Sequence, residues 1–278
     1  MFPLAHGGEH VLRLVCLAQR LRAAGQSVAF ACADPGARVA RSAGFRVVAL
    51  PDISAEAWNA ARTEGTLRLH DEHTIHEHVR LEIEVIRQER PQAVVGDGRL
   101  TLPISAHVAR VPYVQVARAG RSAARLDPPE IPASQRKSVA GVDVTERMPA
   151  PMRRALVRRL LHSWAEPYNR SRRRLGMPVV ESVLDVMTGG LNLLADIPEV
   201  VPARDLPESF HWAGPLMPGL NPDAPPPDWI SSFNPERPTM LVSIERLGSL
   251  DLLTEAIKHF MNSACQAIFV TGDLCRPE

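Results

Sequence analysis

The chain has 278 residues, which suits one large domain or two modest ones at about 100–200 residues per domain. Hydrophobic residues make up 45% and charged residues 23% of the sequence, the usage of an ordinary globular protein with an apolar core. The formal net charge is +1, so no global electric field favours a nucleic acid or an anionic membrane as partner.

The cysteines and the N-terminal segment indicate a cellular compartment. The four cysteines (Cys16, Cys32, Cys265 and Cys275) are scattered and form no C-x-x-C pair, which predicts reduced thiols and a cytoplasmic location. The first residues lack a basic segment followed by an apolar one, so we expect no signal peptide. No apolar run approaches the roughly 18 residues that a membrane span requires.

The first half of the chain alternates short apolar runs with helical patterns. Apolar side chains recur at helical spacing over residues 11–24, and Gly25 follows where a C-cap glycine belongs. We expect strands at 27–33, 45–51, 92–97 and 112–118, helices at 35–44, 67–89 and 100–111, and a loop or broken helix at 52–66. This alternation is typical of a parallel α/β sheet.

The second half begins irregularly and then returns to the same alternation. Residues 119–147 are rich in Pro, Arg and Ser and are expected to be irregular. A basic helix is predicted at 150–175, followed by two strands at 191–196 and 210–216. The Pro-rich segment 217–238 indicates an inter-domain linker. A strand at 239–245, a helix at 250–262 and a strand at 266–272 then predict the start of a second α/β domain.

Several strings, in this order along nearly the whole chain, carry a family resemblance. They are GGEHVLRLVCLAQRLRAAGQSVAFA, PQAVVGDGRL, ARVPYV, NRSRRRLGMP, LLADIPEVVP with FHWAGPL, and PTMLVSI followed by LGS. Together they resemble the GT-B glycosyltransferases of family 1, the nucleotide-sugar-dependent enzymes of the macrolide, flavonoid and UDP-glucuronosyl type. The resemblance implies two Rossmann-like α/β domains that face each other across a cleft.

The same resemblance implies a division of labour along the chain. Residues 1–216 would bind a hydrophobic small-molecule acceptor, residues 217–238 would be the linker, and residues 239–278 would begin the domain that binds the nucleotide-sugar donor, a UDP- or dTDP-sugar. The implied reaction transfers the sugar to an acceptor hydroxyl with inversion. The sugar nucleotide is a co-substrate, and neither a metal nor another cofactor is expected, nor a nucleic-acid partner.

His10 and Asp97 are the predicted catalytic pair. His10 would lie just after the first strand, at the start of the first helix, where the positive end of the helix dipole favours a neutral imidazole. Asp97 ends a predicted strand between two glycines. The family has a histidine base and a partner aspartate at these places, the base taking the proton of the acceptor hydroxyl. Both residues also fit ordinary structural roles, His10 in the first helical turn and Asp97 as a turn or N-cap residue.

Other positions in the sequence bear on donor binding and on activity. Ser243, Gly248 and Ser249 are the candidates for the loop that approaches the donor diphosphate. Glu9 stands where the family usually has glycine and could occupy acceptor space, and Glu245 with Arg246 replaces a common Gly-Ser; both glutamates could equally point to solvent. Nothing in 239–278 resembles the family's His-Gly-rich donor signature. We therefore expect a truncated chain with little or no transfer activity alone, or a non-catalytic small-molecule-binding remnant.

Two further features allow functional or plain structural interpretations. His70, His73, His76 and His78 lie three or four residues apart beside acidic residues, as metal ligands on one helix face would. No spacing matches a zinc signature, and a solvated face opposite an apolar stripe of Ile75, Val79, Ile83 and Ile86 is the plainer prediction.

Residues 147–174 carry nine arginines and no lysine. A partner-binding patch is conceivable, but the stripe Leu156, Leu160 and Trp164 favours an amphipathic helix. The string GGEHV does not form the G-x-G-x-x-G pattern of a dinucleotide-binding loop, which argues against an NAD enzyme.

Overall fold

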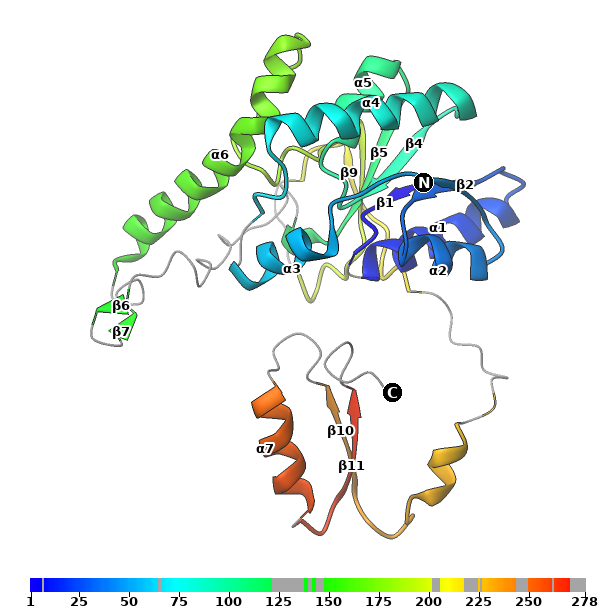
Figure 1. Ribbon diagram of the computed structural model, residues 1–278, viewed down its shortest axis with the longest axis vertical. Helices are drawn as coiled ribbons and strands as arrows, with labels where there is room; N and C mark the ends of the chain where they lie inside the picture. The colour runs from blue at the N-terminus through cyan, green and yellow to red at the C-terminus, as the bar shows by residue number, and fades with distance from the viewer. Residues whose placement is uncertain are drawn as a thin grey trace. The chain divides into compact units, whose positions relative to one another are not determined.

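A parallel sheet organises the first part of the chain. In the computed structural model it has five strands in the order β1-β4-β5-β8-β9, every pair of neighbours being parallel (Figure 1). The strands are β1 (Phe2–Pro3), β4 (Val94–Asp97), β5 (Tyr113–Ala117), β8 (Leu191–Leu194) and β9 (Phe210–Trp212). The structure describes residues 1–6, 8–64, 67–121, 138–139, 142–143, 148–201, 206–217, 225, 227–243, 250–261 and 263–270.

Two more parallel strands lie beside β1. These are β2 (Ala29–Cys32) and β3 (Arg46–Ala49), which pair with each other. The backbone N–H of Ala31 donates to the carbonyl of Met1 at 2.8 Å, and the Met1 ammonium donates to the carbonyl of Ala29 at 2.8 Å. The strand order is therefore β3-β2-β1-β4-β5-β8-β9. Successive strands are added on one side of β1 up to β3 and on its other side from β4 onward, as in a doubly wound α/β fold. The boundary between β1 and β4 is therefore the reversal point of the sheet.

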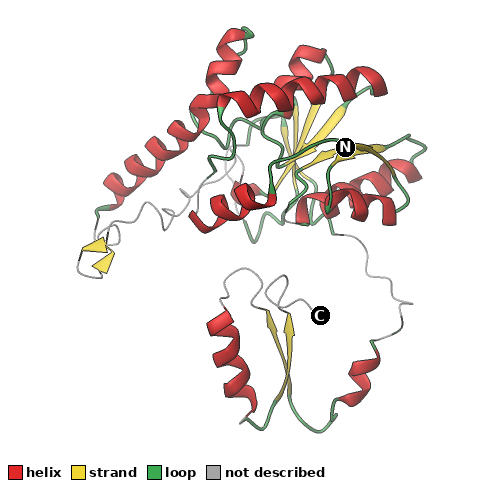
Figure 2. Ribbon diagram, in the orientation of Figure 1, coloured by secondary structure: helices red, strands yellow, loops and turns green. Residues whose placement is uncertain are grey.

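Helices cover both faces of this sheet, as expected for parallel strands (Figure 2). The helices are α1 (Glu9–Ala23), α2 (Gly36–Ser42), α3 (Ala55–Glu64), α4 (Glu72–Glu89), α5 (Leu102–Ala109) and α6 (Ala150–Arg174). Helices α1 and α2 share one apolar cluster with Val116 of β5, whereas α4 and α5 share another with Val94 of β4. The predicted α/β class is confirmed, and the predicted broken helix at 52–66 contains the ordered helix α3.

Helix α4 starts later and faces the core differently than the sequence pattern predicts. The Asp71 carboxylate caps it by accepting the N–H of Thr74 at 2.8 Å, so residues 67–71 are not helical. Of the predicted stripe, Ile75 and Ile86 are buried, but Val79 and Ile83 are only half-buried. Polar side chains, those of His78 and Glu82, take the intervening core positions instead.

Helix α6 is amphipathic, with its buried stripe displaced by one residue from the predicted one. Val157 and Leu161 are buried, whereas Leu156 and Leu160 are half-buried; Trp164 is buried as expected. The segment before α6 contributes the short helix η1 (Ala119–Arg121) and the antiparallel strands β6 (Ser138–Val139) and β7 (Val142–Asp143). The rest of the stretch predicted to be irregular lies outside the described residues.

The chain divides into two compact units, Met1–Gly219 and Leu220–Glu278. The second unit contains the short helix η3 (Asp228–Ser232), strand β10 (Thr239–Ser243), helix α7 (Leu250–Met261) and strand β11 (Gln266–Val270). Strands β10 and β11 are parallel, with Thr239 opposite Gln266, so this unit contains one strand–helix–strand repeat. Over the described residues, no helix is both long and apolar enough to cross a membrane.

Candidate functional site

His10 and Asp97 meet at the reversal point of the sheet. Strand β1 is followed by a loop and then by α1, and His10 is the second residue of α1. Strand β4 ends at Asp97, which lies opposite Pro3 of β1. His10 Nδ1 lies 2.6 Å from Asp97 Oδ1, although 87 residues separate the two in sequence. The crevice outside the carboxyl ends of two such strands is the usual ligand position in open α/β sheets.

A glycine makes room for the imidazole against β4. A Cβ at Gly98 would lie 2.8 Å from both Nδ1 and Cε1 of His10 and 3.1 Å from the Cβ of Leu4. The φ of Gly98 is +76°, a conformation that costs residues with a Cβ about 1–2 kcal/mol. The backbone N–H of Leu4 also donates to the Asp97 carbonyl at 2.8 Å, so the strand ends that carry the pair are joined directly.

Arg13 completes this group of side chains, although the sequence pattern alone did not indicate a role for it. Its Nε donates to Asp97 Oδ2 at 2.7 Å and its Nη2 to Oδ1 at 3.1 Å, which together form a two-pronged ion pair. Arg13 is only 8% exposed. It follows His10 by three residues, so both side chains project from the same face of α1 toward Asp97. The sequence feature that could have indicated this role is a charged residue one turn after the candidate base, among the mostly apolar buried residues of α1.

The distances around Asp97 Oδ1 assign the histidine tautomer. A carboxylate oxygen and an unprotonated ring nitrogen would repel each other at 2.6 Å, so His10 Nδ1 carries the ring proton and donates a hydrogen bond to Asp97 Oδ1. Arg13 Nη2 also lies 3.1 Å from Nδ1, but it can only donate, and the protonated Nδ1 does not accept. The other ring nitrogen, Nε2, is left with its lone pair, as a general base requires.

The three side chains form a buried group whose charges nearly cancel. The His10 side chain keeps 11% of its surface exposed and the Asp97 side chain 2%. With a neutral imidazole, the Asp97 carboxylate and the Arg13 guanidinium sum to zero, which keeps the cost of burial low. Proton uptake by His10 would leave a net positive charge, and Asp97 is the only carboxylate bonded to the imidazole in the part of the chain that the structure describes.

A second buried polar network supports the loops around the pair. Arg99, two residues after Asp97, donates through Nε to Glu82 of α4 at 2.5 Å and through Nη2 to the Pro51 carbonyl at 2.7 Å. Asp52 accepts the N–H of Ala5, in the loop before α1, at 2.8 Å. Burial alone would lower the pKa of Arg99, but the charges of Glu82 and Asp52 raise it. The network joins the loops after β1, β3 and β4 at one edge of the sheet.

The four predicted histidines do not share one environment. His73 and His76 are exposed, but His70 and His78 are buried with their rings 5.0 Å apart, so the predicted fully solvated face is wrong for these two. Burial is the main cause that lowers the pKa of His70 to about 3, and nearby His78 adds to it. Burial and Arg99 lower the pKa of His78 as well. Tyr168 Oη lies 2.7 Å from His70 Nδ1, and burial raises the tyrosine's pKa.

The remaining predicted site residues are less informative. Ser243 is the last residue of β10 and is exposed, whereas Gly248 and Ser249, with Glu245 and Arg246, lie outside the described residues. Glu9 is half-buried as the first residue of α1. Within the described ranges, no group of three or more His, Cys, Asp or Glu side chains is arranged to hold a metal ion.

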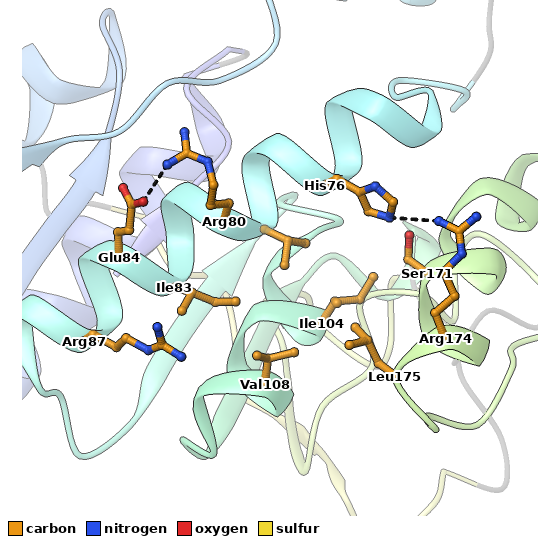
Figure 3. Close-up of a pocket in the computed structure, with 11 residues that line it drawn as sticks. His76, Arg80, Ile83, Glu84, Arg87, Ile104, Val108, Ser171, Arg174 and Leu175 are labelled. Atoms are coloured by element: carbon orange, nitrogen blue, oxygen red, sulfur yellow. Dashed lines mark hydrogen bonds and ion pairs between the residues drawn. The ribbon is translucent and has the colours of Figure 1, made fainter.

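A separate groove of about 460 Å³ lies among α4, α5 and α6 (Figure 3). Its floor is apolar, with Ile83, Ile104, Val108 and Leu175 drawn together between the helices. Arg80 at its edge is paired with Glu84 at 2.5 Å. None of the lining residues belongs to the His10 site, which is built on α1 and therefore on the other face of the sheet.

The chain resembles known glycosyltransferases in sequence, although no family model matches it. It is 30% identical over 249 residues to a PGL/p-HBAD biosynthesis rhamnosyltransferase of Mycobacterium bovis (strain BCG / Pasteur 1173P2), a match that covers 88% of this chain and 53% of that protein. It is 27% identical over 249 residues to an inactive PGL/p-HBAD biosynthesis glycosyltransferase of the same strain, with 88% and 65% covered.

Comparison with solved structures also finds glycosyltransferases. A calicheamicin glycosyltransferase superimposes with a TM-score of 0.59 at 17% identity, over 99% of this chain and 65% of the solved one. The chain thus spans between about half and two thirds of the length of these proteins. By sequence and by fold, the chain is a relative of the glycosyltransferases that adopt the GT-B fold.

Proposed function

We propose that the chain is the acceptor-binding part, with the beginning of the donor-binding part, of an inverting nucleotide-sugar-dependent glycosyltransferase. The observation that carries this proposal is the 2.6 Å contact between His10 Nδ1 and Asp97 Oδ1 at the reversal point of the sheet. It is the pair that the family resemblance implies, and it lies at the carboxyl ends of two parallel strands, the position at which open α/β sheets usually bind ligands. Its tautomer leaves Nε2 as the proton acceptor.

The proposed reaction is a single displacement at the anomeric carbon. His10 Nε2 takes the proton of an acceptor hydroxyl while that oxygen forms its bond to the sugar. The bond from the anomeric carbon to the diphosphate oxygen breaks, the nucleoside diphosphate leaves with the bonding electrons, and the configuration inverts. Asp97 holds the ring through Nδ1–H and stabilises the imidazolium that forms. Arg13 limits that stabilisation because it shares the carboxylate's charge.

The assignment of the two units follows from the same resemblance. Residues 1–216 would bind the acceptor, 217–238 would link the domains, and 239–278 would contribute to the donor site, with Ser243, Gly248 and Ser249 near the diphosphate of a UDP- or dTDP-sugar. A contact between two half-buried rings, those of His6 and Trp58, supports a hydrophobic acceptor. His6, in the loop before α1, stacks on Trp58 of α3 with ring centroids 6.3 Å apart, and its Nε2 is held 2.8 Å from the Ile53 carbonyl.

The decisive experiment is transfer activity of the complete reading frame that contains this chain, with His10→Ala and His107→Ala compared. His107 is an exposed histidine on α5 and serves as the control. We expect His10→Ala to lower kcat by about 100-fold or more with little change in acceptor KM, and His107→Ala to behave as wild type. A His10→Ala enzyme with an unchanged rate would refute the base assignment.

A second function is supported by one of the relatives. The Mycobacterium bovis protein of 27% identity is named an inactive glycosyltransferase, so a chain of this kind can persist without turnover. Under that alternative the acceptor crevice binds a small molecule and no sugar is transferred. Calorimetric titration of the protein encoded by the complete reading frame with UDP and dTDP separates the two functions: heat of nucleotide binding supports the transferase, and its absence supports the alternative.

A further inference from the structure

We propose that Arg13 is a positioning residue that holds the Asp97 carboxylate in the one orientation that keeps the His10 proton on Nδ1. This inference rests on the proposed role of His10 as base. In the described part of the chain, only His10 and Arg13 have side chains bonded to that carboxylate. Arg13 binds both oxygens, and Oδ1 keeps room for Nδ1–H. Rotation of the carboxyl group would break either the fork or the contact to His10.

The position of Arg13 is costly unless the fork forms. It lies in the second turn of α1, whose N-terminus has no side-chain cap and carries the positive end of the helix dipole. A guanidinium buried there is unfavourable unless a carboxylate pairs with it. The pairing geometry is specific to arginine, because a lysine ammonium is a point charge without a planar fork. An Arg13→Lys substitution therefore keeps the positive charge and removes the planar fork, which separates the two contributions.

The assignment of the ring proton depends on that geometry. Arg13 Nη2 lies 3.1 Å from His10 Nδ1, so a small rotation of the carboxylate would let the guanidinium donate to an unprotonated Nδ1. The imidazole would then carry its proton on Nε2 and could not accept one from a hydroxyl. Only with Oδ1 held within hydrogen-bond distance of both Nδ1 and Nη2 does Nε2 remain the accepting nitrogen. The fork thus selects the base-competent tautomer, beyond neutralising a buried aspartate.

Nitrogen NMR of the histidine-labelled protein tests this without any need for activity, because the ¹⁵N shifts distinguish protonated from unprotonated ring nitrogens. Wild type, Arg13→Lys and Arg13→Gln are compared. Arg20→Lys, an exposed arginine of the same helix, is the control, and His10→Gln identifies the resonance. We expect the Nδ1–H tautomer in wild type and in the control. In both Arg13 variants the Asp97 carboxylate is no longer fixed by the fork and can turn away from Nδ1, so we expect a shift of about tenfold toward Nε2–H, the scale of one charge-assisted hydrogen bond.

Two other tautomer results would overturn the proposal. If Arg13→Lys keeps the wild-type tautomer, charge alone suffices and the fork does not position Asp97. A wild-type Nε2–H tautomer would overturn it even if no Arg13 variant folds, which circular dichroism checks. In the protein encoded by the complete reading frame, we expect Arg13→Lys to lower kcat about tenfold and to leave the acceptor KM unchanged. If the tautomer depends on Arg13 while His10→Ala keeps its rate, the proposed function fails and the positioning role stands.

Discussion

Acid should weaken the fold through His70, and the size of the effect can be worked out. The folded pKa of His70 is lowered to about 3 from its usual 6.5, chiefly by burial. The unfolded chain therefore binds a proton below pH 6.5 that the folded chain does not bind until about pH 3. Stability is present above the unfolded pKa and is lost as the pH falls through it. Between pH 7 and pH 5 the loss from this one group is about 2 kcal/mol.

The measurement is urea unfolding of the whole chain at both pH values, followed by tryptophan fluorescence. Trp164 reports on the relevant region because it lies in the same apolar cluster as Tyr168, the hydrogen-bond partner of His70. His70→Gln removes the titrating group and keeps a polar side chain. We expect the variant to lose about 2 kcal/mol less than wild type between pH 7 and pH 5, whatever its stability at pH 7.

The control for this comparison is His73→Gln, which changes an exposed histidine in the first turn of α4, three residues after His70, and should follow the wild-type pH dependence. Equal losses in wild type and His70→Gln would refute the reasoning. The neutral burial of His70, beside His78 and under the influence of Arg99, would then contribute nothing measurable to the acid sensitivity.

Three further substitutions test the site. Gly98→Ala should cost about 1–3 kcal/mol more in urea unfolding than Gly176→Ala, because both have positive φ but only Gly98 has the imidazole within 2.8 Å of the added Cβ; equal costs would show that the contact relaxes freely. Glu82→Gln should destabilise by about 3–5 kcal/mol because it leaves the buried Arg99 charge without its main partner, whereas Glu84→Gln, at an exposed ion pair, should stay within about 1 kcal/mol of wild type. Asp97→Asn should lower kcat of the complete reading frame by about 100-fold or more, and a rate within twofold of wild type, an approximate allowance for assay error, would exclude Asp97 as the orienting group.

The pairing of His10 with Asp97 could be expected from the sequence because strand ends obey simple rules. Each residue follows or ends a predicted strand, and the carboxyl ends of parallel strands meet at one edge of the sheet. The resemblance supplied the roles, and the topology brings the two side chains to 2.6 Å. The strand–helix alternation was similarly accessible, since apolar runs bounded by Gly and Pro are strong local signals.

What the sequence did not reveal depends on partners that lie far apart in the chain. Glu82 looks like a surface residue of an amphipathic helix, yet it is fully buried because Arg99, Thr101 and Ser105 bond to it. A prediction from hydrophobic periodicity places charged residues in water. It therefore predicts that Val79 and Ile83 lie on the core face of α4, although His78 and Glu82 are the more buried residues. The burial of Arg13 could not be predicted for the same reason, because it is favourable only through the pairing with Asp97, 84 residues away in the chain.

The register between β1 and β4, with Phe2 opposite Gly96 and Pro3 opposite Asp97, places the carboxylate of the proposed pair beside the end of β1. A slip of one residue would move Asp97 by about 3.3 Å along the strand and turn its side chain to the other face. Chain length between the two strands does not enter this geometry. Residues gained or lost between β2 and β4, away from Asp52 and Glu82, which bond to Arg99, would therefore leave the carboxylate of the proposed pair in place.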